Sequence, residues 1–116
     1  RAVGAGKTLT AIGLSQSPLA TGFRCNFGFI EVGGADVVVR VTARSGATGE
    51  VLGSSDFPLA ANSLAQANSS MLLGGAGAAF DNFYLQYSVV SGSGRIFAYA
   101  TVNDNTSGDA IYVQAE

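Results

Sequence analysis

Apolar and polar residues alternate along two neighbouring stretches of the chain. The residues expected to face a core are Phe23, Cys25, Phe27 and Phe29 in the first stretch, and Val37, Val39, Val41 and Ala43 in the second. A period of two is typical of a β-strand with one buried side, because successive side chains of a strand point to opposite faces. The loop 33–36, Gly-Gly-Ala-Asp, has the composition of a hairpin turn. The pattern therefore predicts two antiparallel strands joined by a short loop.

The stretch 95–103 differs from these two because both of its sides are apolar. Ile96, Ala98, Ala100 and Val102 form one side, and Phe97 and Tyr99 form the other. Strands that are buried on both sides lie in the middle of a sheet. We therefore expect this strand to lie centrally and to be covered on both faces.

Other periodic stretches predict further strands, separated by turns rich in Gly, Ser, Asn or Pro. Strands are expected at 7–14, 50–57, 83–89 and 109–115, with 50–57 at a sheet edge and a turn over 15–21. The interval 60–79 is less regular and allows a strand through 64–68 and one helical turn at 70–73. No interval shows the period of an amphipathic helix over three turns.

Many short strands between Gly-containing turns are typical of an all-β domain. We expect an antiparallel, Ig-like β-sandwich of seven to eight strands, with a closed barrel as the alternative. A chain of 116 residues is long enough for one core and too short for two. We expect a flexible N-terminal arm over residues 1–6 and a single sandwich domain over residues 7–116.

Charged residues are scarce, at 12% of the chain with a net charge of -2. An average domain carries about twice that fraction. The low charge disfavours nucleic acid as a partner, since binding it needs a basic surface. It leaves two explanations open: part of the surface is hidden in an assembly, or the domain is extracellular and made soluble by Ser, Thr, Asn and Gln. The longest uncharged run, 57–80, contains too many such polar residues for a membrane span.

Residues that carry common enzyme chemistry are few. Histidine, the commonest general base and transition-metal ligand, is absent, and Cys25 is the only cysteine, at a position expected to be buried. The acidic residues fall mainly at turns and strand ends, where turn formation explains them. The oxygen-rich loop 103–109 allows either a calcium ion or a turn closed by Asx hydrogen bonds, and we favour the turn. We therefore expect no enzyme, and no catalytic residue, cofactor or metal site.

The chain has four tyrosines, which allow two readings. They are Tyr84, Tyr87, Tyr99 and Tyr112. Exposed aromatic rings stack against the apolar faces of sugars, and aromatic rings also fill cores and sheet edges. We favour packing, because Tyr84 and Tyr87 point to opposite faces and the chain has no tryptophan.

Three parts of the chain together resemble one bacterial family. They are the stretch 23–29, Gly53 after Val51-Leu52, and the stretch 94–106 with 109–113. These parts are similar to the strands F-R-x-N-x-G and A-Y-A-x-x-x-D-N of an Ig-like β-sandwich module of secreted and cell-surface bacterial proteins. The resemblance covers residues 23–115 and implies export and a non-enzymatic, accessory role. It also implies a structural network that joins strand ends, formed by the matching polar residues Arg24, Asn26, Arg95, Asp104 and Asn105.

The function expected from these observations is that of an extracellular structural or assembly module, secreted or on the cell surface, that forms a homo-oligomer or polymer. The start at Arg1 rather than Met fits removal of a leader. Exposed sheet edges accept extended segments through backbone hydrogen bonds, so we expect the segment 2–14 to add to a neighbouring copy. The assembly residues would be Ala2, Val3, Lys7, Leu9, Ala11 and Leu14. The alternative is a carbohydrate-binding or adhesion module that uses exposed tyrosines with Asn and Asp at loop ends, so glycans are the other partner considered.

Overall fold

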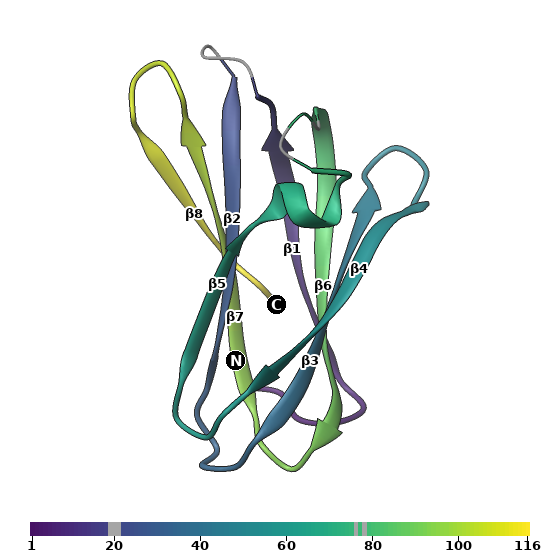
Figure 1. Ribbon diagram of the computed structural model, residues 1–116, viewed down its shortest axis with the longest axis vertical. Coiled ribbons are helices and arrows are strands. Elements are labelled where there is room, and N and C mark those ends of the chain that lie inside the picture. The colour runs from purple at the N-terminus through teal and green to yellow at the C-terminus, as the bar shows by residue number, and fades with distance from the viewer. Residues whose placement is uncertain (19–21, 76, 78) are drawn as a thin grey trace.

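The computed structural model describes residues 1–18, 22–75, 77 and 79–116. These residues form eight strands in two four-stranded antiparallel sheets that pack as a sandwich (Figure 1). The strands are β1 (Thr8–Gln16), β2 (Phe23–Glu31), β3 (Val37–Ser45), β4 (Val51–Leu59), β5 (Leu64–Asn68), β6 (Phe80–Gly92), β7 (Ile96–Asp104) and β8 (Ala110–Gln114). One turn of 3-10 helix, η1 (Ser69–Leu72), follows β5. The predicted antiparallel β-sandwich is therefore confirmed, and two separate sheets stand in place of the alternative closed barrel.

The two sheets are named here after a central strand of each. The β7 sheet has the order β5-β2-β7-β8, and the β3 sheet has the order β1-β6-β3-β4. Figure 1 shows the two sheets as neighbouring layers, with η1 between them. The edge position predicted for the strand 50–57 is confirmed by β4. The strand and the helical turn predicted in the interval 60–79 correspond to β5 and η1.

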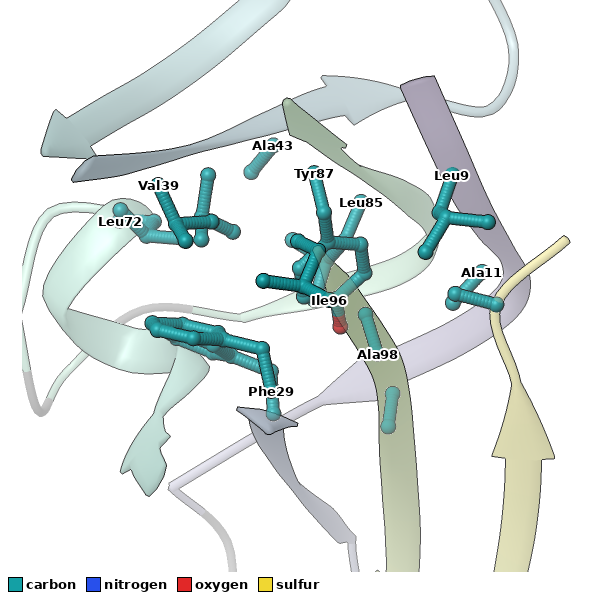
Figure 2. Packing of buried hydrophobic residues seen from close by; sticks show 14 of the residues in the cluster. Leu9, Ala11, Phe29, Val39, Ala43, Leu72, Leu85, Tyr87, Ile96 and Ala98 are labelled. Atoms are coloured by element: carbon teal, nitrogen blue, oxygen red, sulfur yellow. The ribbon is translucent and has the colours of Figure 1, made fainter. Parts of the chain in front are cut away.

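The core fills the space between the sheets. Side chains from both layers meet there, among them Leu9, Val39 and Leu85 from the β3 sheet and Phe29 and Ile96 from the β7 sheet (Figure 2). The alternation predicted for 37–44 is confirmed, because its apolar set is buried and its other set is more exposed. The rings of Phe27, Phe29, Phe57 and Tyr87 have centroids 5.6 to 6.5 Å apart. Phe27 and Phe29 are stacked and the other contacts are tilted or edge-on, which are favourable geometries for aromatic packing.

Cys25 is buried in this core, as predicted. Burial raises the pKa of its thiol to about 11, although a hydrogen bond with Ser69 acts in the opposite direction. The thiolate is the nucleophile, so burial and the raised pKa both lower the reactivity of Cys25.

The strand β1 extends further than the sequence pattern predicts. The pattern ends at Leu14, whereas β1 runs to Gln16, so the turn expected over 15–21 begins later, and its residues 19–21 lie outside the described residues. The reason is a β-bulge after Ala11, with Gly13 at a φ of 72°. A bulge inserts one residue and shifts the alternation, so that Leu14 and Gln16 both face inward.

The position of β7 is central in its sheet, as predicted, but its expected covering on both faces is wrong for the part of the chain that the structure describes. Its inward residues are buried, whereas Phe97 is 40% exposed on the outer side. Apolar atoms make up about half of an average protein surface, so outward aromatic residues do not require a further layer. The outer face of β7 is a surface.

One buried acid joins three loops at the lower end of the sandwich in Figure 1. The Glu31 carboxylate accepts hydrogen bonds from the backbone N–H groups of Gly33, Gly34, Ala35, Asn62 and Arg95. Burial alone would raise the pKa of Glu31, but these backbone donors outweigh it and lower the pKa to about 2. Glu31 is therefore a structural anion, because its carboxylate links the three loops whose backbone N–H groups bind it.

Among the described residues, no helix is long and apolar enough to cross a membrane.

Candidate functional site

The residues expected to mediate assembly lie within the protein's own fold. Leu9, Ala11 and Leu14 are buried in the core, and β1 pairs with β6. On its other side, the backbone of Thr10 exchanges two hydrogen bonds with that of Glu116, with N–O distances of 2.9 and 3.0 Å. In this structure β1 is therefore an intramolecular strand.

The N-terminal residues before β1 contact the start of β7. Val3 is buried and exchanges two backbone hydrogen bonds with Ile96, each 2.9 Å. The carbonyl of Ala2 accepts a hydrogen bond from the Arg95 guanidinium at 3.0 Å, and Lys7 is exposed. The flexibility expected of the N-terminal arm, residues 1–6, stays a prediction.

The five polar residues carried over from the family pattern form separate contacts. Arg24 donates to the side chain of Asn105 at 3.2 Å, which joins β2 to the loop after β7. Asp104 accepts from the backbone N–H groups of Thr106 and Ser107, as in the favoured Asx turn. Asn26 instead accepts from Asn68 on β5, at 3.4 Å.

Arg95 is far from the other members of this set. It precedes β7 whereas Asp104 ends it, and nine residues of strand span about 30 Å. The structure thus brings Arg24 and Asn105 together and keeps Arg95 at the opposite end of the sheet.

The outer faces of the two sheets differ in chemistry. On the β3 sheet, outward side chains pair with one another across strands: Arg40 with Asp56, Arg44 with Gln86, Thr42 with Ser54, and Thr8 with Ser88. The Arg40–Asp56 ion pair has an N–O distance of 2.8 Å, lowers the pKa of Asp56, and is about half exposed on both sides, so its contribution to stability is small. The middle of this face is therefore covered by polar groups that pair with one another, whereas the outward pair of Val38 and Pro58 lies beyond them.

The outer face of the β7 sheet carries aromatic, aliphatic and amide side chains instead. Strand pairing arranges them in rows across the sheet: Leu64, Ile30 and Phe97; then Gln66, Gly28, Tyr99 and Gln114; then Asn68, Asn26, Thr101 and Tyr112. These three rows contain no charged residue, and Arg24 lies one row further on. A surface of this kind suits an uncharged partner.

Tyr99 lies across the sheet at the middle of this face. A Cβ atom at Gly28, on the neighbouring strand β2, would overlap the tip of the Tyr99 ring. The ring therefore covers the backbone of Gly28, and its hydroxyl donates to the side-chain oxygen of Gln66 on β5 at 2.6 Å. From the core side, the Tyr87 hydroxyl donates to the backbone carbonyl of Tyr99 at 2.7 Å. Tyr99 is thus fixed in one orientation before any partner arrives.

Tyr112 on β8 extends the aromatic surface. Its ring is stacked with that of Tyr99, with centroids 5.6 Å apart and an angle of 20° between the ring planes, and it is 63% exposed. Partial burial, and secondly the proximity of Tyr112, raise the pKa of Tyr99, so its hydroxyl stays protonated at neutral pH and remains a donor.

A shallow, open groove of about 340 Å³ adjoins the two rings. It is lined by Asn26, Gln66, Ala67, Asn68 and Thr101, and is called the amide groove below. Each amide side chain carries both a donor and an acceptor. Hydrogen-bonding groups therefore stand beside a flat aromatic surface.

Two other hollows offer less chemistry. The larger, about 500 Å³, has a mostly apolar lining that includes Val38, Pro58 and Leu59, and its one carboxylate, that of Asp36, accepts from the backbone of Ala61 at 2.9 Å. The other contains Arg1, Lys7 and Arg95. Among the described residues, no group of three Cys, Asp or Glu side chains is arranged to hold a metal ion.

A scan against protein-family models found no match to the chain, and the comparisons with curated proteins and with solved structures likewise found no significant match. The comparisons therefore identify no family, and the structure shows the architecture alone, a two-sheet β-sandwich of eight strands.

Sequence reasoning named Tyr99 and Tyr112 only among four tyrosines and favoured packing for them, and it missed the residues that organise them. Gly28 and Gln66 gave no signal of their own, because each acquires its role only from the strands beside it. Glu31 had a local signal, since it stands two residues before Gly33-Gly34, whose backbone N–H groups turn back toward its carboxylate. The buried Gln16, which accepts from the backbone of Cys25 at 2.8 Å, had none.

Proposed function

We propose that the chain is a non-enzymatic, extracellular module that binds neutral polysaccharides through the outer face of its β7 sheet. The observation that carries this proposal is the stacked pair of Tyr99 and Tyr112 beside the amide groove. Sugar rings have apolar C–H faces that pack on aromatic rings, and hydroxyl rims that exchange hydrogen bonds with amides. Both kinds of contact are available side by side on this surface.

The charge of the face favours a neutral ligand. Its three central rows carry no ionisable group other than the tyrosine hydroxyls. An anionic polymer would need basic side chains to replace its hydration, and none lies in these rows. The bacterial module that the sequence resembles adds the proposed location, secreted or on the cell surface.

The openness of the groove favours a polymer over a small molecule. Small-molecule sites enclose most of the ligand surface, whereas this groove leaves one side open to solvent. An internal segment of a long chain can lie across such a surface without its ends being accommodated. We expect weak binding, with Kd on the order of 0.1–1 mM for an oligosaccharide, or about -4 to -5.5 kcal/mol. Fixing Tyr99 in advance reduces the entropy cost.

Removing the aromatic surface should remove most of this affinity. Tyr112→Ala deletes an exposed ring, and Gly28→Ala places a methyl group where the Tyr99 ring lies, which forces that ring away from the sheet. Each variant is expected to weaken binding at least ~10-fold, since stacking and covered area together exceed about 1.4 kcal/mol. The measurement is a screen on an array of neutral oligosaccharides, followed by calorimetric titration of the best ligand.

Tyr84→Ala is the matched control, because Tyr84 lies on β6 in the other sheet and points away from the core. It should bind like the unchanged chain. The proposal fails if no neutral oligosaccharide binds at millimolar concentration, or if Tyr112→Ala binds as tightly as the unchanged chain.

A second candidate function is self-assembly by strand addition, with a specific observation in its favour. β1 is the last strand of its sheet, and it supplies Leu9, Ala11 and Leu14 to the core. A copy of β1 from a neighbour would supply the same side chains, as in strand exchange. For this to occur, the Thr10–Glu116 and Val3–Ile96 backbone pairs must open, and Ala2 and Lys7 must move with the strand. Light scattering from the purified chain separates this candidate, which requires an oligomer, from the first, which does not.

A further inference from the structure

The row of Leu64, Ile30 and Phe97, called the apolar row below, is exposed although its residues are large and apolar. The exposed fractions are 52%, 37% and 40%. The three residues are direct neighbours on adjacent strands, since Ile30 pairs with both Leu64 and Phe97. They form one continuous strip across three strands rather than scattered surface positions, and such strips mark contact sites.

The apolar row lies next to the row that contains Tyr99 and Gln66, two residues along each strand. Phe97 precedes Tyr99 by two residues on β7, so the two side chains share a face about 7 Å apart. The apolar row therefore adjoins both the aromatic surface and the Gln66 end of the amide groove. A sugar stacked on Tyr99 would lie beside the amides of β2 and β5 and, two residues along the strands, beside the apolar row.

A second copy of the chain is a poor fit as the occupant of this face. The four strands of the β7 sheet, of nine, nine, five and five residues, project an outer area of about 450 Å², at ~3.3 Å per residue and ~4.8 Å between strands. Even with an allowance for the relief of its side chains, the area of this face does not exceed the ~800 Å² that each partner buries in a stable interface. A ligand of oligosaccharide width needs no such area.

We propose that the ligand of this face is a neutral polysaccharide whose sugars carry acetyl groups, with the acetyl methyl seated on the apolar row. This rests on the proposed function, since the sugar ring must stack on Tyr99 and Tyr112 for the substituent to reach Phe97. An acetyl group supplies an apolar methyl without charge, which matches the three apolar side chains of this row. The next row toward the strand end carries Arg95, which disfavours a cation there. Unsubstituted sugars would leave the row in water, and deacetylated amino sugars would bring a cation to it.

The test compares two ligands with one backbone. Chitohexaose and cellohexaose are both β-1,4-linked, and they differ in the 2-acetamido group. Calorimetric titration of the full chain is expected to give at least ~4-fold tighter binding of chitohexaose, the gain from covering one methyl-sized group. Equal affinities, or a preference for cellohexaose, would overturn the acetyl proposal while leaving polysaccharide binding in place.

Variants separate the apolar row from the aromatic surface. Phe97→Thr and Ile30→Thr each place a β-branched residue with good strand propensity in the strand, and each should remove the preference for chitohexaose while leaving the cellohexaose affinity within about twofold. Tyr112→Ala should weaken both ligands together. A preference that persists in both threonine variants contradicts the proposal.

Two further outcomes have distinct meanings. If neither hexasaccharide nor any arrayed neutral glycan binds, the proposed function itself fails. If sedimentation shows that the unchanged chain is a dimer and that Phe97→Thr is a monomer, the apolar row is a self-association surface, and the acetyl proposal is overturned.

Discussion

Deletion of residues 1–14 is expected to abolish the cooperative thermal transition of the domain. The deletion removes Leu9, Ala11 and Leu14 from the core and exposes the edge of β6. A buried leucine contributes about 2–5 kcal/mol relative to alanine, and whole domains are stable by only about 5–15 kcal/mol. Two leucines and a strand therefore account for most of the stability. The measurement is circular dichroism of the shortened chain as a function of temperature.

A peptide of residues 1–16 should restore the transition when added in excess, because its side chains fill the vacated space. A control peptide with Leu9→Ser and Leu14→Ser should not. Rescue by the first peptide alone would show that β1 can act in trans, which strand addition requires. A shortened chain that melts like the full one would contradict the assignment of β1 to the core.

Replacement of Glu31 by alanine should give the second large effect. The carboxylate accepts from backbone N–H groups in the loops after β2, β4 and β6, and without it these donors lose their partner. Unpaired buried donors are costly, and we expect Tm to fall by on the order of 10–20 °C. Glu50→Ala, an exposed acid in the loop before β4, should change Tm by less than about 3 °C. Differential scanning calorimetry measures both, and a small effect of Glu31→Ala would contradict the role assigned to this carboxylate.

The same residue should make stability depend on pH in acid. Its folded-state pKa of about 2 is below the ordinary value of 4.5 because hydrogen bonds favour the charged form. Its stabilisation is therefore complete above pH ~4.5 and is lost as the pH falls toward 2. Tm of the unchanged chain should decline across this window, and Glu31→Gln should start lower and decline less. Parallel curves for the two proteins would contradict the expectation.

The architecture could be predicted from the sequence because burial on one side leaves a period of two. Along β3, Val37, Val39 and Val41 recur with a period of two, which predicted both the strand and its inward face. The end of β1 could not be predicted, because the bulge at Gly13 resets the alternation in the middle of the strand. The wrong expectation that β7 is covered twice has a similar origin, since periodicity shows which side a residue faces and not whether protein or solvent lies there.

The candidate site was less predictable because it depends on register. Alternation indicates that Tyr99 points outward, but not that Gly28 stands beside it or that Gln66 stands one strand further. Without a glycine in that position the ring could not lie flat on the sheet. The flat aromatic surface is thus a property of three strands together, and no single stretch of sequence encodes it.

The most direct test of the account is to map the binding surface by titrating an isotope-labelled chain with chitohexaose and recording two-dimensional NMR spectra. The account predicts that the shifts concentrate at outward residues of β2, β5, β7 and β8, strongest near Tyr99, Tyr112 and Gln66. Shifts confined to the β3 sheet near Arg40 and Asp56, or an unchanged spectrum at millimolar ligand, would contradict it.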